Sequence, residues 1–387
     1  MDLNIMDFDW SEEQQVIHDA ATSFARRELD FQTASRDNTS EFSSDLWRKC
    51  GREGILGSFI PKTFGGRGYD MLTTIYMLEG LGYGCRDNGL TLALNGQLWS
   101  VQQPILQFGS EDQKRRFLPG LCSGEILAAD GATEPEAGSD AMSIRTTATR
   151  CEGGYRLNGH KTYIGMAPIA DFSLVFAATD PELKQWGLSV FLVEQSSEGY
   201  WASPPVEKMG LRTVPMGDLR FKDCFVPEAN RLGPEGAGGS IFANAMEWER
   251  AFIFASHVGA MHRQLDQCIA YANDRRQFGK QIGQFQSVSN RIADMRVRLE
   301  TSRFLLYKLA WEKDRGRSTA LESAMSKLHL SEAFVASSFD AIRIHGGRGF
   351  VSEAEVERDL RDSVGGVIYG GTSDIQRVVI AKLLGLS

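Results

Sequence analysis

Residues 254–268, FASHVGAMHRQLDQC, indicate how the last third of the chain folds. Apolar residues recur there at spacings of four and three, the period of one helix face, at Phe254, Val258, Met261, Leu265 and Cys268. The same periodicity predicts a second helix over residues 288–309 and a third over residues 325–342, which Gly346 and Gly347 end as a C-terminal cap would. Long helices joined by short connections predict a bundle.

The residues before this bundle divide into two further regions. Residues 1–125 favour helices, with candidate starts at Ser11 and Ser44. Between about residue 126 and residue 232, short runs of β-branched and aromatic residues predict strands at 155–157, 172–176, 188–193 and 219–221. We therefore predict a mainly α chain with a central β domain, divided into domains at 1–125, 126–232 and 233–387.

Composition disfavours several classes of function. The 387 residues carry a formal net charge of −8 without a strongly basic segment, which argues against a nucleic-acid partner. The six cysteines are scattered without a Cys-x-x-Cys pair and there are only six histidines, which argues against a zinc site and for a reducing compartment. The N-terminus lacks a signal-peptide pattern and no apolar stretch reaches about 18 residues, so we expect a soluble, cytoplasmic protein.

Two strings carry a resemblance that covers essentially the whole chain. Residues 368–377, IYGGTSDIQR, and residues 133–140, TEPEAGSD, are similar to motifs of the acyl-CoA dehydrogenase family. The resemblance implies an N-terminal helical domain, a middle β-barrel-like domain and a C-terminal four-helix bundle. It also implies an FAD cofactor between the β domain and the bundle. No Gly-x-Gly-x-x-Gly occurs, which disfavours a Rossmann dinucleotide site.

The resemblance predicts a relocated catalytic base. Most members carry a Glu where this chain has Gly370, and that Glu removes the substrate α-proton. A minority place the carboxylate just before an Arg on an earlier helix, as Glu249 precedes Arg250 here. Glu247 lies two residues away, about 200° around a helix, so only one of the two can face the flavin. We predict Glu249 as the base, Arg250 as its support, and the Gly370 amide as a donor to the thioester carbonyl.

The same resemblance assigns flavin contacts to the β domain. Thr133 would bond to the flavin ring, and Ser139 would lie toward the flavin phosphate or the substrate arm. Tyr163 stands where the family usually has Trp, and it can still offer an aromatic face. Gly165 stands where the family usually has Thr or Ser, so a backbone amide or a water would have to contact flavin N5.

Further flavin contacts are expected from the C-terminal domain. Residues 275–286 resemble the segment that reaches the FAD of a neighbouring subunit, and a glycine-rich turn near residue 346 allows close backbone approach. The candidate contacts are Arg275, Phe278, Gln286, Gly346, Gly347, Thr372 and Ser373. A shared site implies at least a homodimer, and the family usually forms homotetramers.

The predicted substrate follows from three strings, residues 159–171, 246–250 and 370–374. Together they most resemble a subgroup that oxidises aminoacyl groups, notably prolyl, held as thioesters on a peptidyl carrier protein, en route to pyrroles. Electron-transfer flavoprotein or oxygen is the expected electron acceptor. Acidic carrier proteins need a locally basic docking surface, for which residues 114–116, Lys-Arg-Arg, are one candidate and a solvated helix face the alternative.

Three other functions stay open. A short- or branched-chain acyl-CoA dehydrogenase is the first alternative, because the relocated base also occurs there. A related flavoprotein that has lost catalysis and serves as a binding partner is the second, and Glu249 counts against it. A nitroalkane-oxidase-like flavoprotein would use an Asp base, so Glu249 gives that function no support.

Overall fold

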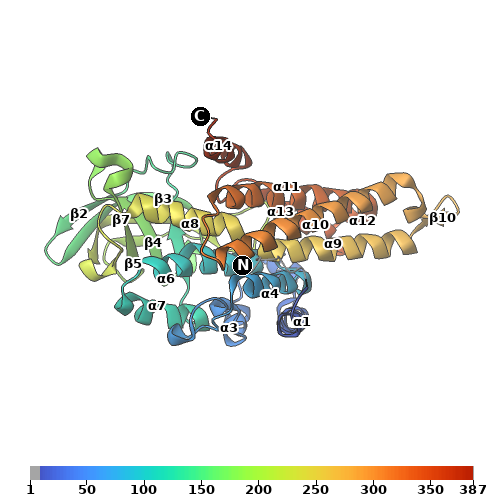
Figure 1. Cartoon of the computed structure of the whole chain (residues 1–387), viewed down its shortest axis with the longest axis horizontal. Coiled ribbons are helices and arrows are strands. Elements are labelled where there is room, and N and C mark those ends of the chain that lie inside the picture. The colour runs from blue at the N-terminus through green and yellow to red at the C-terminus, as the bar shows by residue number, and fades with distance from the viewer. Residues whose placement is uncertain (1–8, 387) are drawn as a thin grey trace, which may run out of the picture.

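The computed structural model describes residues 9–386, which form a helical region, a sheet and a second helical region in chain order (Figure 1). The first helical region contains α1 (Glu12–Phe24), α2 (Thr33–Thr39), α3 (Ser44–Arg52), α4 (Met71–Gly84), α5 (Asn88–Gly96), α6 (Gln103–Phe108) and α7 (Glu111–Ser123). Ser11 caps α1 as predicted, because its hydroxyl accepts the Gln14 amide and the Gln14 side chain accepts the Ser11 amide. Helix α3 begins at Ser44 as predicted, and Ser43 is its N-cap.

A π-helical segment, η4 (Gln97–Gln102), joins α5 to α6. Wide turns of this kind inside helices are rare and often occur at functional sites. The segment is buried throughout and includes Ser100, whose hydroxyl contacts the C-terminal region.

The sheet lies to one side of the molecule (Figure 1). Its strands are β1 (Ala128–Gly131), β2 (Thr147–Cys151), β3 (Gly154–Gly165), β4 (Phe172–Ala178), β5 (Leu188–Glu194), β6 (Tyr200–Ala202), β7 (Met216–Pro227) and β8 (Arg231–Leu232). The order is β6-β7-β3-β2-β4-β5-β8, and β1 pairs with β4 in parallel. All four predicted strand runs lie within strands of this sheet, and β4 is buried along its whole length.

The second helical region extends away from the sheet as long helices (Figure 1). It contains α8 (Gly238–Phe252), α9 (Ala255–Asp274), α10 (Gln286–Lys313), α11 (Ala320–His345), α12 (Gly347–Phe350), α13 (Val356–Gly366) and α14 (Ser373–Leu383), with a small hairpin of β9 (Arg276–Gln277) and β10 (Lys280–Gln281). The prediction that Phe254 is helical is wrong. The chain turns between α8 and α9, and Phe254 caps α9 with φ −96° and ψ 7°. Gly346 ends α11 with a φ of +60°, as predicted.

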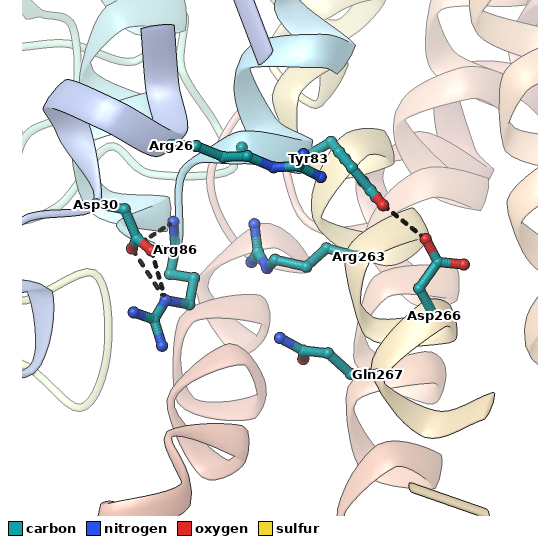
Figure 2. Close-up of a pocket in the computed structure, with 8 residues that line it drawn as sticks. Arg26, Asp30, Tyr83, Arg86, Arg263, Asp266 and Gln267 are labelled. Atoms are coloured by element: carbon teal, nitrogen blue, oxygen red, sulfur yellow. Dashed lines mark hydrogen bonds and ion pairs between the residues drawn. The ribbon is translucent and has the colours of Figure 1, made fainter. Parts of the chain in front are cut away.

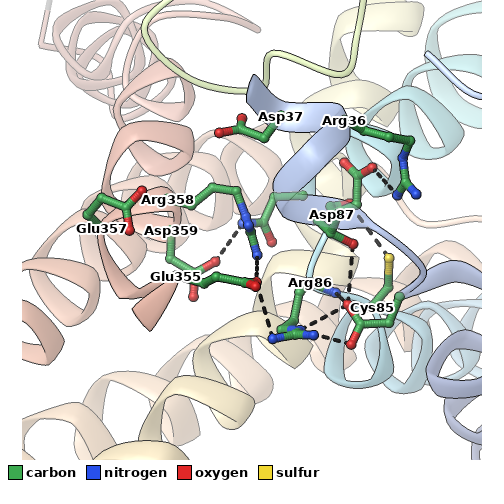
Figure 3. Close-up of polar contacts among 12 residues, drawn as sticks. Arg36, Asp37, Cys85, Arg86, Asp87, Glu355, Glu357, Arg358 and Asp359 are labelled. Carbon is green, nitrogen blue, oxygen red and sulfur yellow. Dashed lines mark hydrogen bonds and ion pairs between the residues drawn. The ribbon is translucent and has the colours of Figure 1, made fainter. Parts of the chain in front are cut away.

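Polar contacts hold α13 against the first helical region (Figure 3). Arg86 pairs with Glu355 over 3.1 Å, and the Asn88 side-chain amide donates to Asp359 over 2.7 Å. Charge-assisted bonds of this kind are among the stronger hydrogen bonds in proteins. Because the loop that carries Gly370 follows α13 directly, these contacts fix that loop relative to α5. Among the helices of residues 9–386, none has both the length and the apolar composition needed to cross a membrane.

Candidate active site

Glu249 lies in the last turn of α8 and its side chain is only 8% exposed. The Ser100 hydroxyl donates to Glu249 Oε2 over 2.9 Å, so η4 fixes the orientation of the carboxyl group. Burial raises the pKa of Glu249, and the Ser100 bond, Arg250 and Lys327 each oppose that rise. A buried carboxyl group with a raised pKa is well suited to act as a general base near neutral pH.

Gly370 lies directly against this carboxyl group. Its φ is +65°, a conformation that other residues rarely adopt, and a Cβ built on it would stand 3.1 Å from Glu249 Oε1. The Gly370 carbonyl oxygen accepts from Arg250 Nε over 3.1 Å and from Gln376 Nε2 over 3.0 Å. Arg250 therefore holds the glycine loop in place from the residue next to Glu249.

Glu247 faces a different part of the molecule, as the helical rotation predicts. It pairs with Lys313, and it accepts the Thr319 hydroxyl over 2.7 Å and the Thr319 amide over 3.2 Å. These bonds lower its pKa against the effect of burial, so Glu247 is held as an ionised structural group. The choice of Glu249 over Glu247 is consistent with this geometry.

Three buried polar groups near Glu249 have no pattern in the sequence that could have revealed them. Lys327 Nζ and the Tyr369 hydroxyl have no hydrogen-bond partner among residues 9–386, and burial lowers the pKa of Lys327 to about 8. Asp130 Oδ1, on β1, also lacks a partner within that range. Tyr369 and Asp130 both have their pKa raised by burial first and by the Glu249 charge second. The fold alone brings these groups from three distant segments to one carboxylate.

The two predicted flavin strings of the β domain lie side by side. The Thr162 amide donates to the Thr133 carbonyl over 3.0 Å, and buried Lys161 pairs with Glu134 over 2.8 Å. Tyr163 lies at a register shift of β3 with a φ of +58°, and its ring is 70% exposed. Beside it, an added Cβ at Gly165 would come no closer than 4.0 Å to any side chain. Ser139 is exposed on the following loop.

Thr372 and Ser373 lie at the start of α14, directly after the glycine loop. The Thr372 hydroxyl accepts the Ile375 amide over 3.2 Å and so caps the helix. Ser373 Oγ is buried, with no partner in the described part of the chain. Ser373 therefore has a hydroxyl left for a ligand, whereas the Thr372 hydroxyl is already engaged.

The remaining predicted flavin contacts lie at the other end of the bundle. Helix α9 has 20 residues, so its C-terminus is about 30 Å from its start beside α8. Figure 1 shows β10 at the tip of the bundle, away from the sheet. Arg275, Phe278 and Gln286 are exposed there, and the Phe278 ring is 93% exposed.

The turn at Gly346 and Gly347 reaches the same tip. The His345 ring stacks on Tyr271 of α9 at 4.4 Å between ring centres, which places the end of α11 beside the end of α9. A Cβ added at either glycine would meet nothing within 4 Å. One chain therefore brings this second group of residues together, but not with Tyr163 and Glu249.

A separate hollow of about 270 Å³ lies between α4, α9 and the segment after α1 (Figure 2). Two pairs of its charged and polar groups are already joined: Arg86 pairs with Asp30 over 2.8 Å, and the Tyr83 hydroxyl donates to Asp266 over 2.7 Å. Its lining residues are not those of the Glu249 site. Residues 9–386 contain no group of three or more His, Cys, Asp or Glu side chains that could hold a metal ion.

Two features define the class of this protein. Helical regions precede and follow a sheet domain in the chain, and a buried carboxyl group lies against a glycine loop. The chain belongs to the acyl-CoA dehydrogenase family, whose N-terminal, middle and C-terminal domain models match residues 11–125, 129–224 and 236–385.

The chain is also similar to particular members. It is 45% identical to an L-prolyl-[peptidyl-carrier protein] dehydrogenase of Pseudomonas fluorescens, over 90% of this chain and 92% of that protein. It is similar to the crystal structure of the prolyl acyl carrier protein oxidase AnaB, with a TM-score of 0.97 and 46% identity over 98% of this chain and all of that one. The structure of PigA with FAD and proline gives a TM-score of 0.96 and 41% identity, with the same coverage.

Proposed function

We propose that this protein is an FAD-dependent dehydrogenase of acyl thioesters, and that its acyl group is a prolyl-type aminoacyl group on a peptidyl carrier protein. The observation that carries the proposal is the buried carboxyl group of Glu249 against Gly370, where a Cβ would meet it at 3.1 Å. The similarity to the prolyl dehydrogenase and to PigA supports the choice of acyl group.

The residues around Tyr163 fit an isoalloxazine ring. An exposed ring beside an open glycine, on a strand held by the Lys161–Glu134 pair, offers a flat apolar surface with backbone amides at its edge. Thr133, Tyr163, Gly165 and Ser373 would hold the flavin end of the cofactor. FAD, when bound, supplies the acceptor for the hydride that leaves the substrate β-carbon.

Glu249 removes the α-proton of the thioester in this proposal. Its burial excludes water and keeps its pKa raised, and Ser100 holds Oε2 so that Oε1 faces the space beside Gly370. The Gly370 amide donates to the thioester oxygen as negative charge develops there. Arg250 and Gln376 fix that loop through the Gly370 carbonyl, so they position the donor without contacting the substrate.

Packed aromatic side chains beside the base favour a small acyl group. Trp99, next to Ser100, is fully buried and lies 5.1 Å from the Phe252 ring and 4.9 Å from the Phe59 ring, centre to centre. Its indole N–H donates to Asn95 over 3.1 Å, which fixes its orientation. A five-membered ring needs far less room than a long acyl chain, which would have to displace this cluster.

The cofactor site needs a second subunit in this proposal. Arg275 and Phe278 lie about 30 Å from the Glu249 end of α9 and are exposed at the bundle tip. A guanidinium group suits a pyrophosphate because its planar fork donates two hydrogen bonds to phosphate oxygens. We therefore infer at least a homodimer, in which the tip of one subunit completes the FAD site of its partner.

The decisive experiment is anaerobic mixing of the purified holoprotein with prolyl-loaded carrier protein and, separately, with a panel of acyl-CoAs. Bleaching of the flavin's visible band by the prolyl carrier protein alone supports the proposal. Bleaching by a short or branched acyl-CoA would instead assign the protein to the oxidation of those acids. A yellow protein that bleached with neither would contradict both assignments and favour a non-catalytic role.

A further inference from the structure

Asp130 is a half-buried acid that the reaction described above does not use. It lies on β1, three residues before Thr133, and its Oδ1 is shielded from solvent without a hydrogen-bond partner in residues 9–386. Leaving a shielded carboxyl oxygen unpaired is unfavourable, so such atoms normally carry a partner. The position therefore calls for a ligand group that completes it.

The strand that carries Asp130 and the Glu249 carboxyl group both contact η4. The Ala128 amide on β1 donates to the Gln97 side chain of η4 over 3.2 Å, and Ser100 of η4 donates to Glu249. Asp130 is two residues further along β1. The Glu249 charge also acts on Asp130 directly, since it adds to the burial that raises the pKa of Asp130.

Of the cationic side chains nearby, Lys161 and Arg250 are bonded to other groups, and Lys327 acts electrostatically on Glu249. Lys161, which acts on Asp130 electrostatically, bonds to Glu134 over 2.8 Å and to the Ala132 carbonyl over 3.2 Å. Arg250 holds the Gly370 carbonyl. Asp130 is thus coupled to Glu249 without a bonded cation among residues 9–386, and a cation supplied by a ligand would balance the two acids.

We propose that Asp130 binds the secondary ammonium group of the prolyl substrate and so selects aminoacyl over plain acyl thioesters. This inference rests on the proposed function. In a prolyl thioester the nitrogen is bonded to the carbon that loses its proton, so a group that contacts that hydrogen must lie near the nitrogen too. Glu249 then removes the α-hydrogen as a proton, and Asp130 accepts a hydrogen bond from the ammonium group beside it.

The pairing gives selectivity through what other substrates lack. A plain acyl thioester places a methylene where the ammonium nitrogen would be, and it leaves the shielded Oδ1 of Asp130 unpaired. Sites built around a polar partner reject analogues without that partner far more strongly than apolar pockets reject a small change in size. Asp130 is therefore a specificity-determining residue, separate from the base.

The test compares two loads on one carrier protein: prolyl, and cyclopentanecarbonyl, in which a methylene replaces the ring nitrogen. Anaerobic flavin bleaching gives the maximal rate and the half-saturating concentration for wild type and for Asp130→Asn, which keeps the shape and removes the charge. We expect Asp130→Asn to lose roughly 10- to 100-fold in kcat/KM on the prolyl load, the usual effect of losing a charged hydrogen bond. Most of this loss should appear as a higher half-saturating concentration. The loss on the cyclopentanecarbonyl load should stay below about threefold.

Asp223→Asn is the matched control, because Asp223 is an exposed acid on β7 of the same sheet, at a φ of +48° that Asn tolerates. This variant should leave kcat/KM unchanged on both the prolyl and the cyclopentanecarbonyl load. Equal losses of Asp130→Asn on both loads, or loss of bound FAD, would overturn the inference and make Asp130 a support of the flavin site. No loss on the prolyl load would overturn it as well. If wild type itself fails to bleach with the prolyl load, the proposed function fails, and this inference with it.

Discussion

The Glu249 carboxyl group fills the space into which a side chain at residue 370 would project. A Cβ on Gly370 would stand 3.1 Å from Glu249 Oε1, closer than most real contacts of a Cβ atom. Two acids could not occupy this space together without one of them moving. The glycine and the glutamate therefore depend on each other: α8 supplies the base, and the loop at residue 370 supplies only its backbone.

Gly370→Ala tests this arrangement. The added methyl group should displace the Glu249 carboxyl group and lower the rate of flavin bleaching by at least tenfold, and the φ of +65° should cost about 1–2 kcal/mol of stability. Gly385→Ala is the control, because Gly385 has a φ of +79° with nothing within 4 Å of an added Cβ. It should share the backbone strain and keep the rate. If Gly370→Ala also kept the rate, the two residues would not share one space.

Glu249→Gln tests the base itself. We expect FAD to stay bound and the rate of flavin reduction to fall roughly 10²- to 10⁴-fold, the usual contribution of a general base. Glu247→Gln is the matched control on the same helix. It breaks the bonds to Lys313 and Thr319, so it should lower the melting temperature and change the rate little. A loss below threefold in Glu249→Gln would place the base elsewhere.

The sequence predicted the elements whose pattern is local. The three helices beyond residue 255, the four strand runs and the Gly346 cap all appear in the structure. Burial on one face explains the period in α9 and α10, whereas the periodic residues of α11 are half-buried or exposed, with Met325 41% and Phe339 51% exposed. The error at Phe254 has a physical reason too. Its apolar spacing fits α9, but it is buried as the cap that follows the turn after α8, and periodicity cannot distinguish the two.

The base could be predicted from the sequence, because Gly370 stands where the family usually has a Glu and Glu249 is an acid at the alternative position. The groups around it could not be inferred. Ser100 lies 149 positions from Glu249 along the chain, and their hydrogen bond depends on the packing of η4 against α8. In the sequence, Asp130 is an ordinary residue at the end of a short strand, and only the burial of its Oδ1 without a partner separates it from a solvated acid.

The pH dependence of the reaction should follow the groups that hold Glu249. The ionised form is the base, so the rate rises as pH rises through the Glu249 pKa. Ser100 and Lys327 both lower that pKa, Ser100 more than Lys327. Ser100→Ala and Lys327→Met should therefore shift the acidic limb of the rate profile to higher pH, with the larger shift in Ser100→Ala. Lys308→Met, at a half-exposed lysine paired with Glu312, should leave the limb in place. A shift to lower pH in either site variant would contradict this electrostatic account.

Docking of a carrier protein should depend on Arg115 more than on its neighbours. Lys114 pairs with Glu111 and Arg116 with Glu194, whereas Arg115 is 63% exposed and lies 3.9 Å from Glu111. Arg115→Glu should raise the half-saturating concentration of the prolyl carrier protein and spare a prolyl pantetheine thioester, with a larger effect at low salt. Equal losses on the two substrates would remove this surface from docking.

Mixed oligomers test whether the bundle tip serves the partner's cofactor site. Arg275→Glu should lose FAD affinity, and Glu249→Gln should lose the base, so each homo-oligomer is inactive. In a mixed dimer, one site would combine the intact Glu249 of one subunit with the intact Arg275 of the other. Random reassortment should then restore about one site in four, by the symmetry of a dimer. Recovery of flavin bleaching after the two inactive variants are unfolded and refolded together, but not separately, would establish the shared site. If each chain instead used its own Arg275, no mixture could form an intact site, and the mixed sample would stay as inactive as its components.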